Sequence, residues 1–448
     1  MRTMKSPSPR RQQGTATLVV VMVLFLIMAM MAAYGSRNLI FEQKIAGNYF
    51  RAGVSQEAAE AGVEWAIALL NGVKIDANCQ VSAVGANSFR ERYLNINAGD
   101  RTVVAPVIYK NRVADCVRNE AAGWTCRCPM GNPPALPTQV ALNDAQNLQP
   151  RFALSFTSAT PGPLPATVPR PGIIRLISEG CSSSGSAECI ESDNFAVQAS
   201  VGVSLVTVDL ALLSALKNPP ATPLTLTGAM SLGASGIGLH NAAPRSNGLL
   251  LSSALGSSQT SGLDETRLES LPGTPGRQAL IFDDPSLKNP DGTAKDGEAL
   301  FRMFFGMSRA SYREQAALRR IGCPAGDCGP TLQQAYDAGA RMAWIDGPLT
   351  INSNVTLGAD TSPMLIVADG AVQLNGPMRL TGLLFANGNL DWSNGSAMPA
   401  QLKGAMLVAG ALSTSGVIDL WYEGKVMDEL SNRTGSFVRV PGSWFDSP

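Results

Sequence analysis

The chain has 448 residues and carries 35 Lys and Arg against 35 Asp and Glu, so its formal net charge is zero. This length is enough for two or three domains, and the neutral balance leaves no basic excess for binding nucleic acid. Only 16% of the residues are charged, whereas 44 Gly and 29 Pro are abundant. That composition favours a loop-rich β body outside the cytoplasm over a helical cytosolic enzyme.

A hydrophobic stretch begins near the N-terminus. Between Arg11 and Arg37 the sequence has no charged residue, and residues 15–34 are nearly all apolar. About 20 such residues span the hydrocarbon core of a bilayer as a helix, so we predict a membrane-spanning segment at 15–36. The residues before it are basic and lack acids, which predicts a cytoplasmic N-terminus and a translocated body.

The helical pattern continues past the predicted membrane segment. Apolar residues recur at steps of three and four up to residue 70, with no proline in between. We therefore predict one helix over residues 15–71, about 80 Å long. Its second half is amphipathic, and we expect the stripe of Tyr49, Phe50, Val54, Ala61 and Trp65 to pack on a soluble domain.

Three motifs of this N-terminal region belong together. Gly14 ends the basic leader (residues 1–14), E-x-K-x-A-G-N occupies residues 42–48, and A-A-E-A-G occupies residues 58–62. Over roughly residues 11–70 the chain resembles the N-terminal segment of PilX-type minor pilins of the type IV pilus. The V-P-G-S-W-F-D run at 440–446 is similar to the C-terminal ending of that family.

The resemblance implies a processed, membrane-anchored subunit. A prepilin peptidase would cleave after Gly14, and the new N-terminus, Thr15, would be methylated. The chain would wait in the inner membrane with its N-terminus in the cytoplasm, and the assembly platform would then move it into an extracellular pilus. Its partners would be other minor and major pilins. The side chains expected to pack against neighbouring helices are Leu18, Val19, Met22, Leu26, Ala58 and Glu60.

One position departs from the pattern of the major subunits. Those subunits carry a glutamate at the fifth mature position, which is Val19 here. A carboxylate in lipid is costly unless it is paired, and in major pilins that glutamate is thought to meet the N-terminal amine of a neighbour. Val19 therefore favours a rare subunit near the filament tip over a repeated shaft subunit.

All eight cysteines follow the predicted membrane segment. An oxidising compartment favours disulfides over a zinc site. Cys181 and Cys189 flank a polar loop, and Cys323 and Cys328 flank a tight turn, so we expect each pair to form a local bridge.

The other four cysteines leave a choice. Cys126 and Cys128 are separated by a single residue, which disfavours a bond between them. Each is expected to reach either Cys79 or Cys116, so two connectivities remain open.

The sequence after the helix divides into two parts that differ in residue composition and pattern. Residues 72–215 contain several β-branched runs bounded by Gly, Pro and Ser, which predict an antiparallel sheet against the long helix. Residues 216–448 contain short β runs punctuated by Gly, which predict either a β-solenoid or a sandwich. The overall fold class is therefore α+β: a long helix on a pilin-like sheet, followed by a large β-rich domain.

Within the second part, residues from about 263 to 343 read as a helical insertion. Residues 297–322 and 329–344 have helical composition and spacing. Phe301, Phe304, Phe305 and Met307 form an apolar cluster that we expect to pack on the β domain, with a face for a partner or ligand as the alternative.

Motifs for catalysis are missing from the sequence, and we predict that the chain is not an enzyme and needs no cofactor. The single histidine, His240, has no metal-ligand neighbour at helical spacing and no G-x-S-x-G serine. Asn289, Asp291 and Glu298 partly match a calcium loop, but the first ligand position is Leu287. A calcium site there is the weaker reading, and a solvated turn the stronger one.

Three functions fit these observations. The first is a minor pilin that promotes the start of pilus assembly and lies at the tip. The second is an adhesion module that binds a surface through residues 216–448. The third is the equivalent minor pseudopilin of a type II secretion system.

Overall fold

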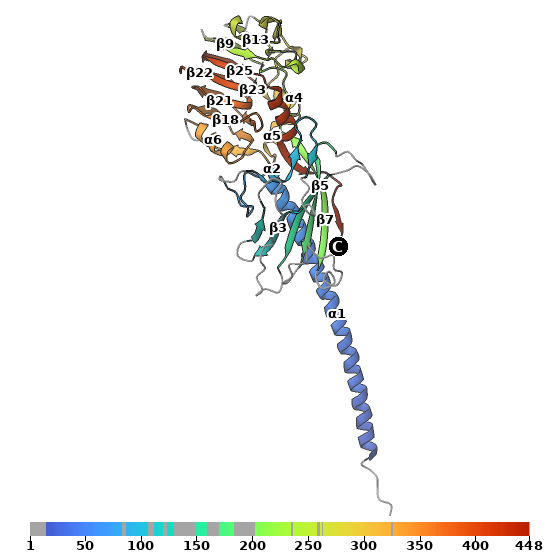
Figure 1. The fold of residues 1–448 in the computed structure, drawn as a ribbon. Coiled ribbons are helices and arrows are strands. Elements are labelled where there is room, and N and C mark those ends of the chain that lie inside the picture. Colours follow the sequence, from blue (N-terminus) through green and yellow to red (C-terminus); the bar gives the residue numbers. More distant parts are fainter. Residues whose placement is uncertain are drawn as a thin grey trace, which may run out of the picture.

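A computed structural model describes most of the chain. The described residues are 15–82, 87–105, 112–119, 123–129, 149–158, 170–182, 202–233, 236–257, 260–261, 263–323 and 326–447. They form a long helix, a pilin-like body around its C-terminal half, and a β-rich domain beyond the body (Figure 1).

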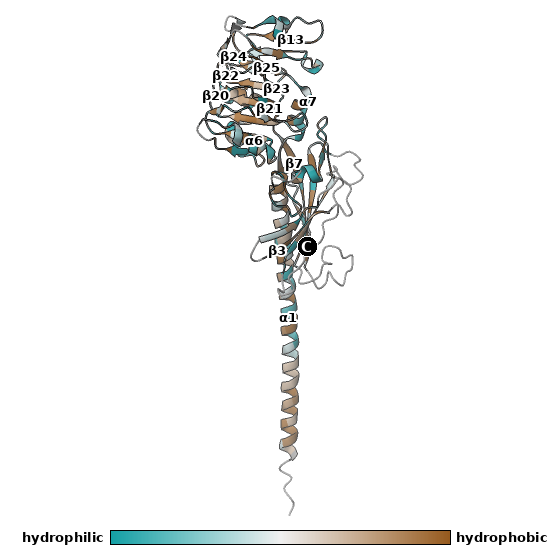
Figure 2. Cartoon of the chain, turned by 60° about the vertical axis from the view of Figure 1, so that its left-hand side comes forward, coloured by the Kyte–Doolittle hydropathy of each residue, from teal (hydrophilic) through white to brown (hydrophobic). Residues whose placement is uncertain are grey.

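The N-terminal helix α1 spans Thr15–Leu70 and contains 56 residues, which corresponds to about 84 Å. Its bounds agree with the prediction from periodicity. The N-terminal half stands free of the body and is predominantly apolar, whereas the C-terminal half lies against the sheet (Figure 2).

The sheet of the body is antiparallel, and it packs on α1 through β5, β6 and β7. In the described residues it has seven strands, in the order β26-β7-β6-β5-β3-β4, with β27 also paired to β7. The strands are β3 (Arg112–Asn119), β4 (Gly123–Arg127), β5 (Arg151–Ser158), β6 (Ile173–Cys181), β7 (Val203–Ser214), β26 (Gly435–Arg439) and β27 (Phe445–Ser447). A short helix, α2 (Phe89–Tyr93), and the hairpin of β1 (Asn95–Ile96) and β2 (Val103–Val104) complete the body.

The C-terminal tail corrects the predicted domain boundary. Residues 216–448 were expected to form one domain, but β26 and β27 return to the body and pair antiparallel with β7. Gly435 lies opposite Ser214 in this register. The β-rich domain is therefore an insertion between two neighbouring strands of the pilin-like sheet, a long-range pairing that local patterns do not encode.

The inserted domain is a parallel β-solenoid, which decides between the two predicted architectures. Its coils stack in register: Leu349 lies beside Val372, Val372 beside Leu390, Leu390 beside Leu412 and Leu412 beside Met230. The number of residues between stacked positions differs from coil to coil. Only the strands must stack, and the connecting loops absorb the differences in length.

The solenoid strands come from two segments of the chain. The first supplies β8 (Leu224–Leu226), β9 (Met230–Leu232), β10 (Gly238–His240), β11 (Leu251–Ser253), β12 (Thr260–Ser261), β13 (Leu268–Glu269) and β14 (Leu280–Ile281). The second supplies β15 (Arg319–Ile321), β16 (Met342–Ile345), β17 (Leu349–Ile351), β18 (Thr356–Leu357), β19 (Met364–Ala368), β20 (Val372–Asn375), β21 (Arg379–Ala386), β22 (Leu390–Asn394), β23 (Ala400–Val408), β24 (Leu412–Gly416) and β25 (Ile418–Trp421).

Order in space differs from order in the chain. The last coil of the second segment stacks on the first coil of the first segment, since β8, β9 and β10 pair with β23, β24 and β25. The chain enters the solenoid in its middle, winds to the far end, and returns by helices to β15 at the end near the body (Figure 1).

The solenoid has three faces around one apolar interior, which contains Leu349, Ile366, Leu384, Trp392 and Leu420 among others. We call them the covered face (β8, β11, β14, β16, β19 and the C-terminal parts of β21 and β23), the polar face (β9, β12, β17, β20, β22, β24) and the charged face (β10, β13, β18, β25 and the N-terminal parts of β21 and β23). On the covered face, Trp344 and Phe385 pack against Phe301, as expected for the apolar cluster.

The helical insertion is shorter than predicted. β13 and β14 lie within residues 263–343 but belong to the solenoid, so the helices begin only at α4 (Gly297–Phe305). α5 (Arg309–Arg313) and α6 (Gly329–Asp337) follow, each ending before a parallel strand. Residues 319–321 and 342–345, expected to be helical, form β15 and β16 because they complete coils of the solenoid. A last helix, α7 (Gly424–Asp428), covers β21 and β23 and leads through a π-turn at Glu429–Arg433 to β26.

Candidate assembly helix and domain junction

The free half of α1 exposes apolar side chains that pack on no other part of the described residues. Leu18, Val19, Met22 and Leu26 are between 58% and 67% exposed, and Phe25 is 74% exposed. Burying this surface in lipid or against other helices is worth about 25 cal/mol for each Å² removed from water. The free half is therefore built to be covered by something outside this chain.

The exposed stretch reaches beyond the predicted membrane segment. Tyr49 and Phe50, expected to pack under the sheet, are 77% and 59% exposed. The first fully buried side chain along α1 is Ser55, whose hydroxyl bonds the Ser204 hydroxyl at 2.9 Å. Contact with the sheet starts about one turn later than the aromatic residues suggested.

Small residues make the contact between helix and sheet. Ala58, Ala59, Val63 and Ala66 are buried against it. Gly180 of β6 approaches the helix backbone so closely that a Cβ atom there would lie 2.1 Å from the carbonyl oxygen of Ser55. The body therefore contacts α1 by close backbone approach. Trp65 packs against Phe89 and Phe152, whereas Tyr49 and Phe50 stay exposed.

The sequence-predicted packing residues fall into separate places. Leu18, Val19, Met22 and Leu26 lie on the free half, whereas Ala58 is buried in the body. Glu60 is exposed and accepts a hydrogen bond from Gln56 on the same helix, so it does not pack on the sheet. Gly14 lies outside the described residues, and Thr15 is the first residue of α1.

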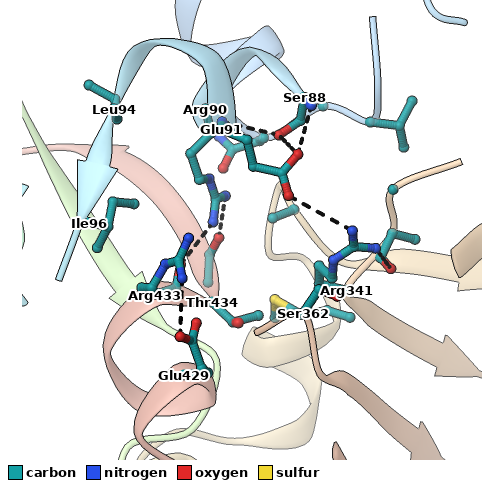
Figure 3. Close-up of a pocket in the computed structure, with 18 of the residues that line it drawn as sticks. Ser88, Arg90, Glu91, Leu94, Ile96, Arg341, Ser362, Glu429, Arg433 and Thr434 are labelled. Atoms are coloured by element: carbon teal, nitrogen blue, oxygen red, sulfur yellow. Dashed lines mark hydrogen bonds and ion pairs between the residues drawn. The ribbon is translucent and has the colours of Figure 1, made fainter. Parts of the chain in front are cut away.

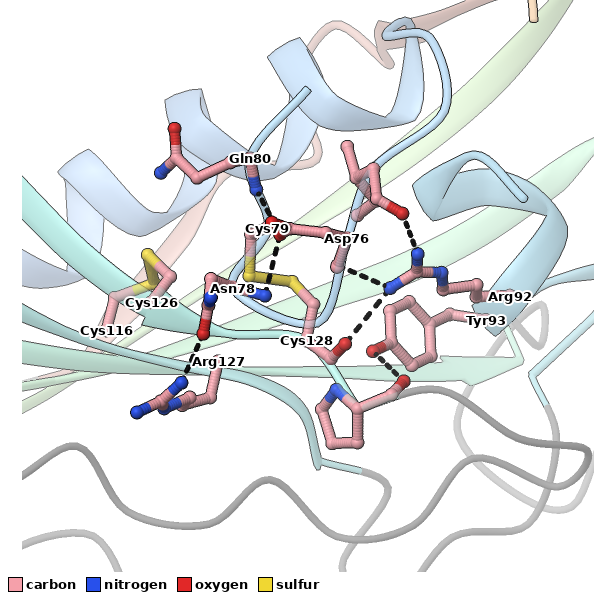
Figure 4. The surroundings of a disulfide bond; sticks show 12 residues. Asp76, Asn78, Cys79, Gln80, Arg92, Tyr93, Cys116, Cys126, Arg127 and Cys128 are labelled. Atoms are coloured by element: carbon pink, nitrogen blue, oxygen red, sulfur yellow. Dashed lines mark hydrogen bonds between the residues drawn. A yellow bond between two sulfur atoms is a disulfide. The ribbon is translucent and has the colours of Figure 1, made fainter. Parts of the chain in front are cut away.

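Two disulfides lie beside each other in the body, one tying the loop after α1 to the sheet and one joining β3 to β4 (Figure 4). Cys79 bonds Cys128, and Cys116 bonds Cys126, which is one of the two open connectivities. Cys116 and Cys126 lie opposite each other on β3 and β4, while Cys128 extends past the end of β4 toward the loop. Arg92 donates hydrogen bonds to the main-chain carbonyls of Asp76 and Cys128, which fixes this loop on α2.

The other predicted bridges lie elsewhere. Cys323 bonds Cys328 between β15 and α6, at the base of the solenoid. Cys181 ends β6 and is buried, whereas Cys189 lies outside the described residues, so this pairing stays a prediction.

The C-terminal end of α1 lies at the junction of the two domains (Figure 3). Arg90 of α2 donates to the carbonyl of Leu70 through Nε at 3.2 Å and to that of Gly435 through Nη2 at 2.7 Å. Asn71 exchanges two hydrogen bonds with the backbone of Phe437, at 2.9 and 2.8 Å. Arg319 lies on β15, at the solenoid end near the body, and donates to the carbonyl of Asn71 at 3.0 Å.

These contacts join three distant parts of the sequence. The helix end, the tail strand β26 and the solenoid base meet within one hydrogen-bonded cluster. Sequence reasoning identified Asn71 only as a helix stop and missed the arginines. Their buried position depends on the tertiary fold, and no local motif marks it.

Each residue of the partial calcium-loop match is bonded to other side chains. Asn289 donates its amide to Thr293, Asp291 accepts from the backbone and hydroxyl of Thr293, and Glu298 pairs with Arg302 and Arg309. Asn289 and Asp291 thus meet at Thr293, whereas Glu298 pairs with the two arginines. Within the described ranges, no group of three or more acidic, His or Cys side chains is arranged to hold a metal ion.

His240 lies on the charged face of the solenoid. Its Nδ1 is 2.8 Å from Glu269 Oε2 and its Nε2 is 3.2 Å from Asp419 Oδ1, and its ring stacks on Trp421. Burial alone would lower the pKa of His240, but the hydrogen bonds to Asp419 and Glu269 outweigh burial and raise it. Because both ring nitrogens are occupied, His240 links neighbouring coils and has no nitrogen left to act as a base.

An uncovered apolar helix seated on an antiparallel sheet defines a pilin-like subunit, a protein built to join others through its N-terminal segment. The family model described as PilX N-terminal matches residues 13–64. The N-terminal segment is therefore similar to that of PilX-type minor pilins, and the fold is type IV pilin-like.

Two further comparisons were made. The crystal structure of the competence-associated pilin ComZ from Thermus thermophilus is similar at 12% sequence identity and a TM-score of 0.23, over 88% of this chain and 97% of that chain. A search of curated proteins returned no match.

Proposed function

We propose that the chain is a minor pilin that enters a type IV pilus through α1, promotes the start of assembly and lies at the tip. The observation that carries this proposal is the match to the PilX N-terminal model on a helix whose apolar half is exposed among the described residues. In assembly, contacts with neighbouring helices would replace the lipid around this half. The inner-membrane platform would extract the helix after a prepilin peptidase has cleaved behind Gly14.

The position of the solenoid supports a place at the tip. It lies beyond the C-terminal end of α1, on the side away from the apolar half (Figure 1). With the N-terminus of α1 toward the membrane, a subunit stacked outward of this one would meet the solenoid. Subunits added on the membrane side would not meet the solenoid. Val19, where a shaft subunit would carry glutamate, supports the same position.

Mass spectrometry of the mature N-terminus tests the processing step. We expect a chain that begins at a methylated Thr15. An intact Met1, or cleavage near Arg37, would contradict the pilin assignment.

A second function, adhesion through the solenoid, is favoured by the polar face. A row of short polar side chains crosses its coils in register: Thr350, Gln373, Asp391, Ser413 and Ser231. A groove of about 410 Å³ runs along this row. Strands repeat every ~4.8 Å, so the face offers a regular array of hydroxyl and amide groups with one carboxylate, Asp391, suited to a polyhydroxylated surface such as a neutral glycan.

A deletion separates the two functions. Because Ser214 and Gly435 are paired, residues 216–433 can be replaced by a short turn without removing a strand of the body. Pili that form but no longer attach would identify the solenoid as the adhesion module. Loss of pili would show that the solenoid is needed to start assembly. Normal piliation and attachment would contradict both roles for the solenoid.

A further inference from the structure

A cavity of about 80 Å³ lies at the junction of the pilin body and the solenoid. The end of α1, helix α2, the solenoid base and the turn before β26 surround it (Figure 3). A water molecule occupies about 30 Å³ in the liquid. The cavity therefore has room for several waters or a small polyatomic ion.

The charges around the cavity do not balance. Four arginines line it, namely Arg90, Arg319, Arg341 and Arg433, but only two carboxylates, Glu91 and Glu429. The formal excess is thus two positive charges, from four cations less two anions. The C-terminal dipole of α1 contributes about half a negative charge. That offsets a quarter of the excess, so the cavity keeps a net positive charge.

Both carboxylates already form hydrogen bonds or ion pairs with neighbouring side chains. Glu91 accepts hydrogen bonds from Ser88 and lies 3.8 Å from Arg341. Glu429 pairs with Arg433 at 3.1 Å, and burial raises the pKa of Glu429, which weakens it as a counter-charge. Within the described part of the chain, Arg90 and Arg319 form no ion pair, and their hydrogen bonds go to main-chain carbonyls.

The arginines also repel one another. Burial lowers the pKa of Arg90 to about 10, and although Glu91 opposes this, the charges of Arg433 and Arg341 lower it further. Burial likewise lowers the pKa of Arg319. Cations enclosed without counter-charges are costly, and guanidinium groups match the geometry of oxyanions well.

We propose that this cavity binds one small tetrahedral oxyanion, such as phosphate or sulfate, which neutralises the excess charge and joins the solenoid to the body. Ser362 and Thr434 also line the cavity, and their hydroxyl groups are further hydrogen-bonding partners for an ion. Bound there, the ion would be held from both domains, since Arg90 and Arg433 belong to the body and its tail while Arg319 and Arg341 belong to the solenoid segment.

The test uses the full chain in detergent, with inorganic phosphate as the probe. Thermal unfolding is followed by tryptophan fluorescence while phosphate replaces chloride at constant ionic strength. We expect the midpoint to rise by about 3 °C at ten times the dissociation constant. No difference between phosphate and chloride would overturn the proposal.

Adjacent residues on β15 supply the matched variants. Arg319→Gln removes a cavity arginine and should abolish the phosphate response. Arg320→Gln changes its neighbour, which points away to pair with Asp346 and is 53% exposed, and should leave the response intact. Equal responses in both variants would contradict a specific site, since general salt effects on protein stability act on both alike.

A second variant keeps the test decisive if Arg319→Gln does not fold. Thr434→Asp places a fixed carboxylate on the cavity wall beside Arg433. This variant should unfold at a higher temperature than the natural chain without phosphate and should no longer respond to it. A Thr434→Asp chain that gains as much from phosphate as the natural chain would overturn the proposal.

Discussion

In the pilin-like body, the C-terminal half of α1 and one face of the antiparallel sheet bury each other, with strands drawn from residues far apart in the chain. In the solenoid, each coil closes its own section of interior and stacks on the coils beside it. Cys79–Cys128 and Cys116–Cys126 cross-link the body, and Cys323–Cys328 lies at the base of the solenoid, while the stacked coils are held by packing and parallel strand pairing. Loss of one contact should therefore weaken the body as a whole, but the solenoid only over neighbouring coils.

The largest loss of stability is expected from a substitution in the solenoid interior. Trp392 is fully buried, so Trp392→Ala should destabilise the solenoid by about 4 kcal/mol through a cavity. Chemical unfolding followed by circular dichroism should then show a separate early transition for the solenoid, with the body unchanged. Trp421→Ala is the control, because Trp421 is 39% exposed and should cost about 1 kcal/mol. A single cooperative transition shifted for both domains would contradict the proposed independence.

The second effect tests the disulfides of the body. The Cys79–Cys128 bond closes a separation of 49 residues, so replacing both cysteines by Ala should cost about 3 kcal/mol. Cys323–Cys328 closes a separation of only 5 residues, so its removal should cost less. Urea unfolding of the two double variants measures the difference. A larger loss from the short bridge would show that constraint of the unfolded chain is not the deciding factor.

The third effect tests the close approach of helix and sheet. Gly180→Ala would push a methyl group into the backbone of α1 and should destabilise the body by about 2 kcal/mol. Gly53→Ala on the free side of the same helix meets no atom within 4 Å, so it should stabilise the helix slightly, by about 0.5 to 1 kcal/mol. Thermal unfolding of the body transition distinguishes them. If both variants behave alike, the contact at Gly180 is not tight.

The smallest effect is a pH dependence of the solenoid. The folded pKa of His240 is raised above its unfolded value, so its contribution is complete below the unfolded pKa and is lost as pH rises through the folded pKa. The free energy of unfolding of the solenoid should fall by about 1 kcal/mol between mildly acidic and mildly basic pH. Since the chain has one histidine, His240→Gln should abolish this slope. An unchanged slope in that variant would assign the effect to other groups.

Sequence predicted the two domains unequally well. The bounds of α1 were predicted because apolar periodicity and the absence of proline are local signals. The end of β7 at Ser214 also falls close to the predicted boundary at 215–216. The return of β26 to β7 was missed because that pairing joins residues more than 200 positions apart, and nothing in either strand specifies its partner.

A usable solenoid signal was present in the sequence but obscured by unequal spacing. Gly347, Gly370, Gly388, Gly410 and Gly228 each precede an x-apolar-polar triplet, and they stack at one corner. At Gly370 an added Cβ would lie 2.7 Å from the carbonyl carbon of Gly347, so the coils can approach only without side chains there. The motif recurs once per coil, although no fixed period connects the copies.

Some features of the candidate site could be predicted from the sequence, and others could not. The free half of α1 follows from composition, and the local Cys323–Cys328 bridge follows from spacing. The buried arginines of the junction do not, because Arg90, Arg319 and Arg433 are ordinary surface residues by sequence. Only the fold brings them to one cavity.

The insertion of the solenoid between β7 and β26 determines how the molecule would carry tension. A pull on the solenoid would enter the body through the adjoining ends of two neighbouring strands, at Ser214 and Gly435. β7 is paired with β6 from Ile173 to Cys181, so a load along β7 would shear that whole ladder at once. The bonds from Arg319 to Asn71 and from Asn71 to Phe437 would pass part of the load directly to α1. A pilus that retracts while its tip is attached would therefore strain many hydrogen bonds together, which is the arrangement that resists rupture.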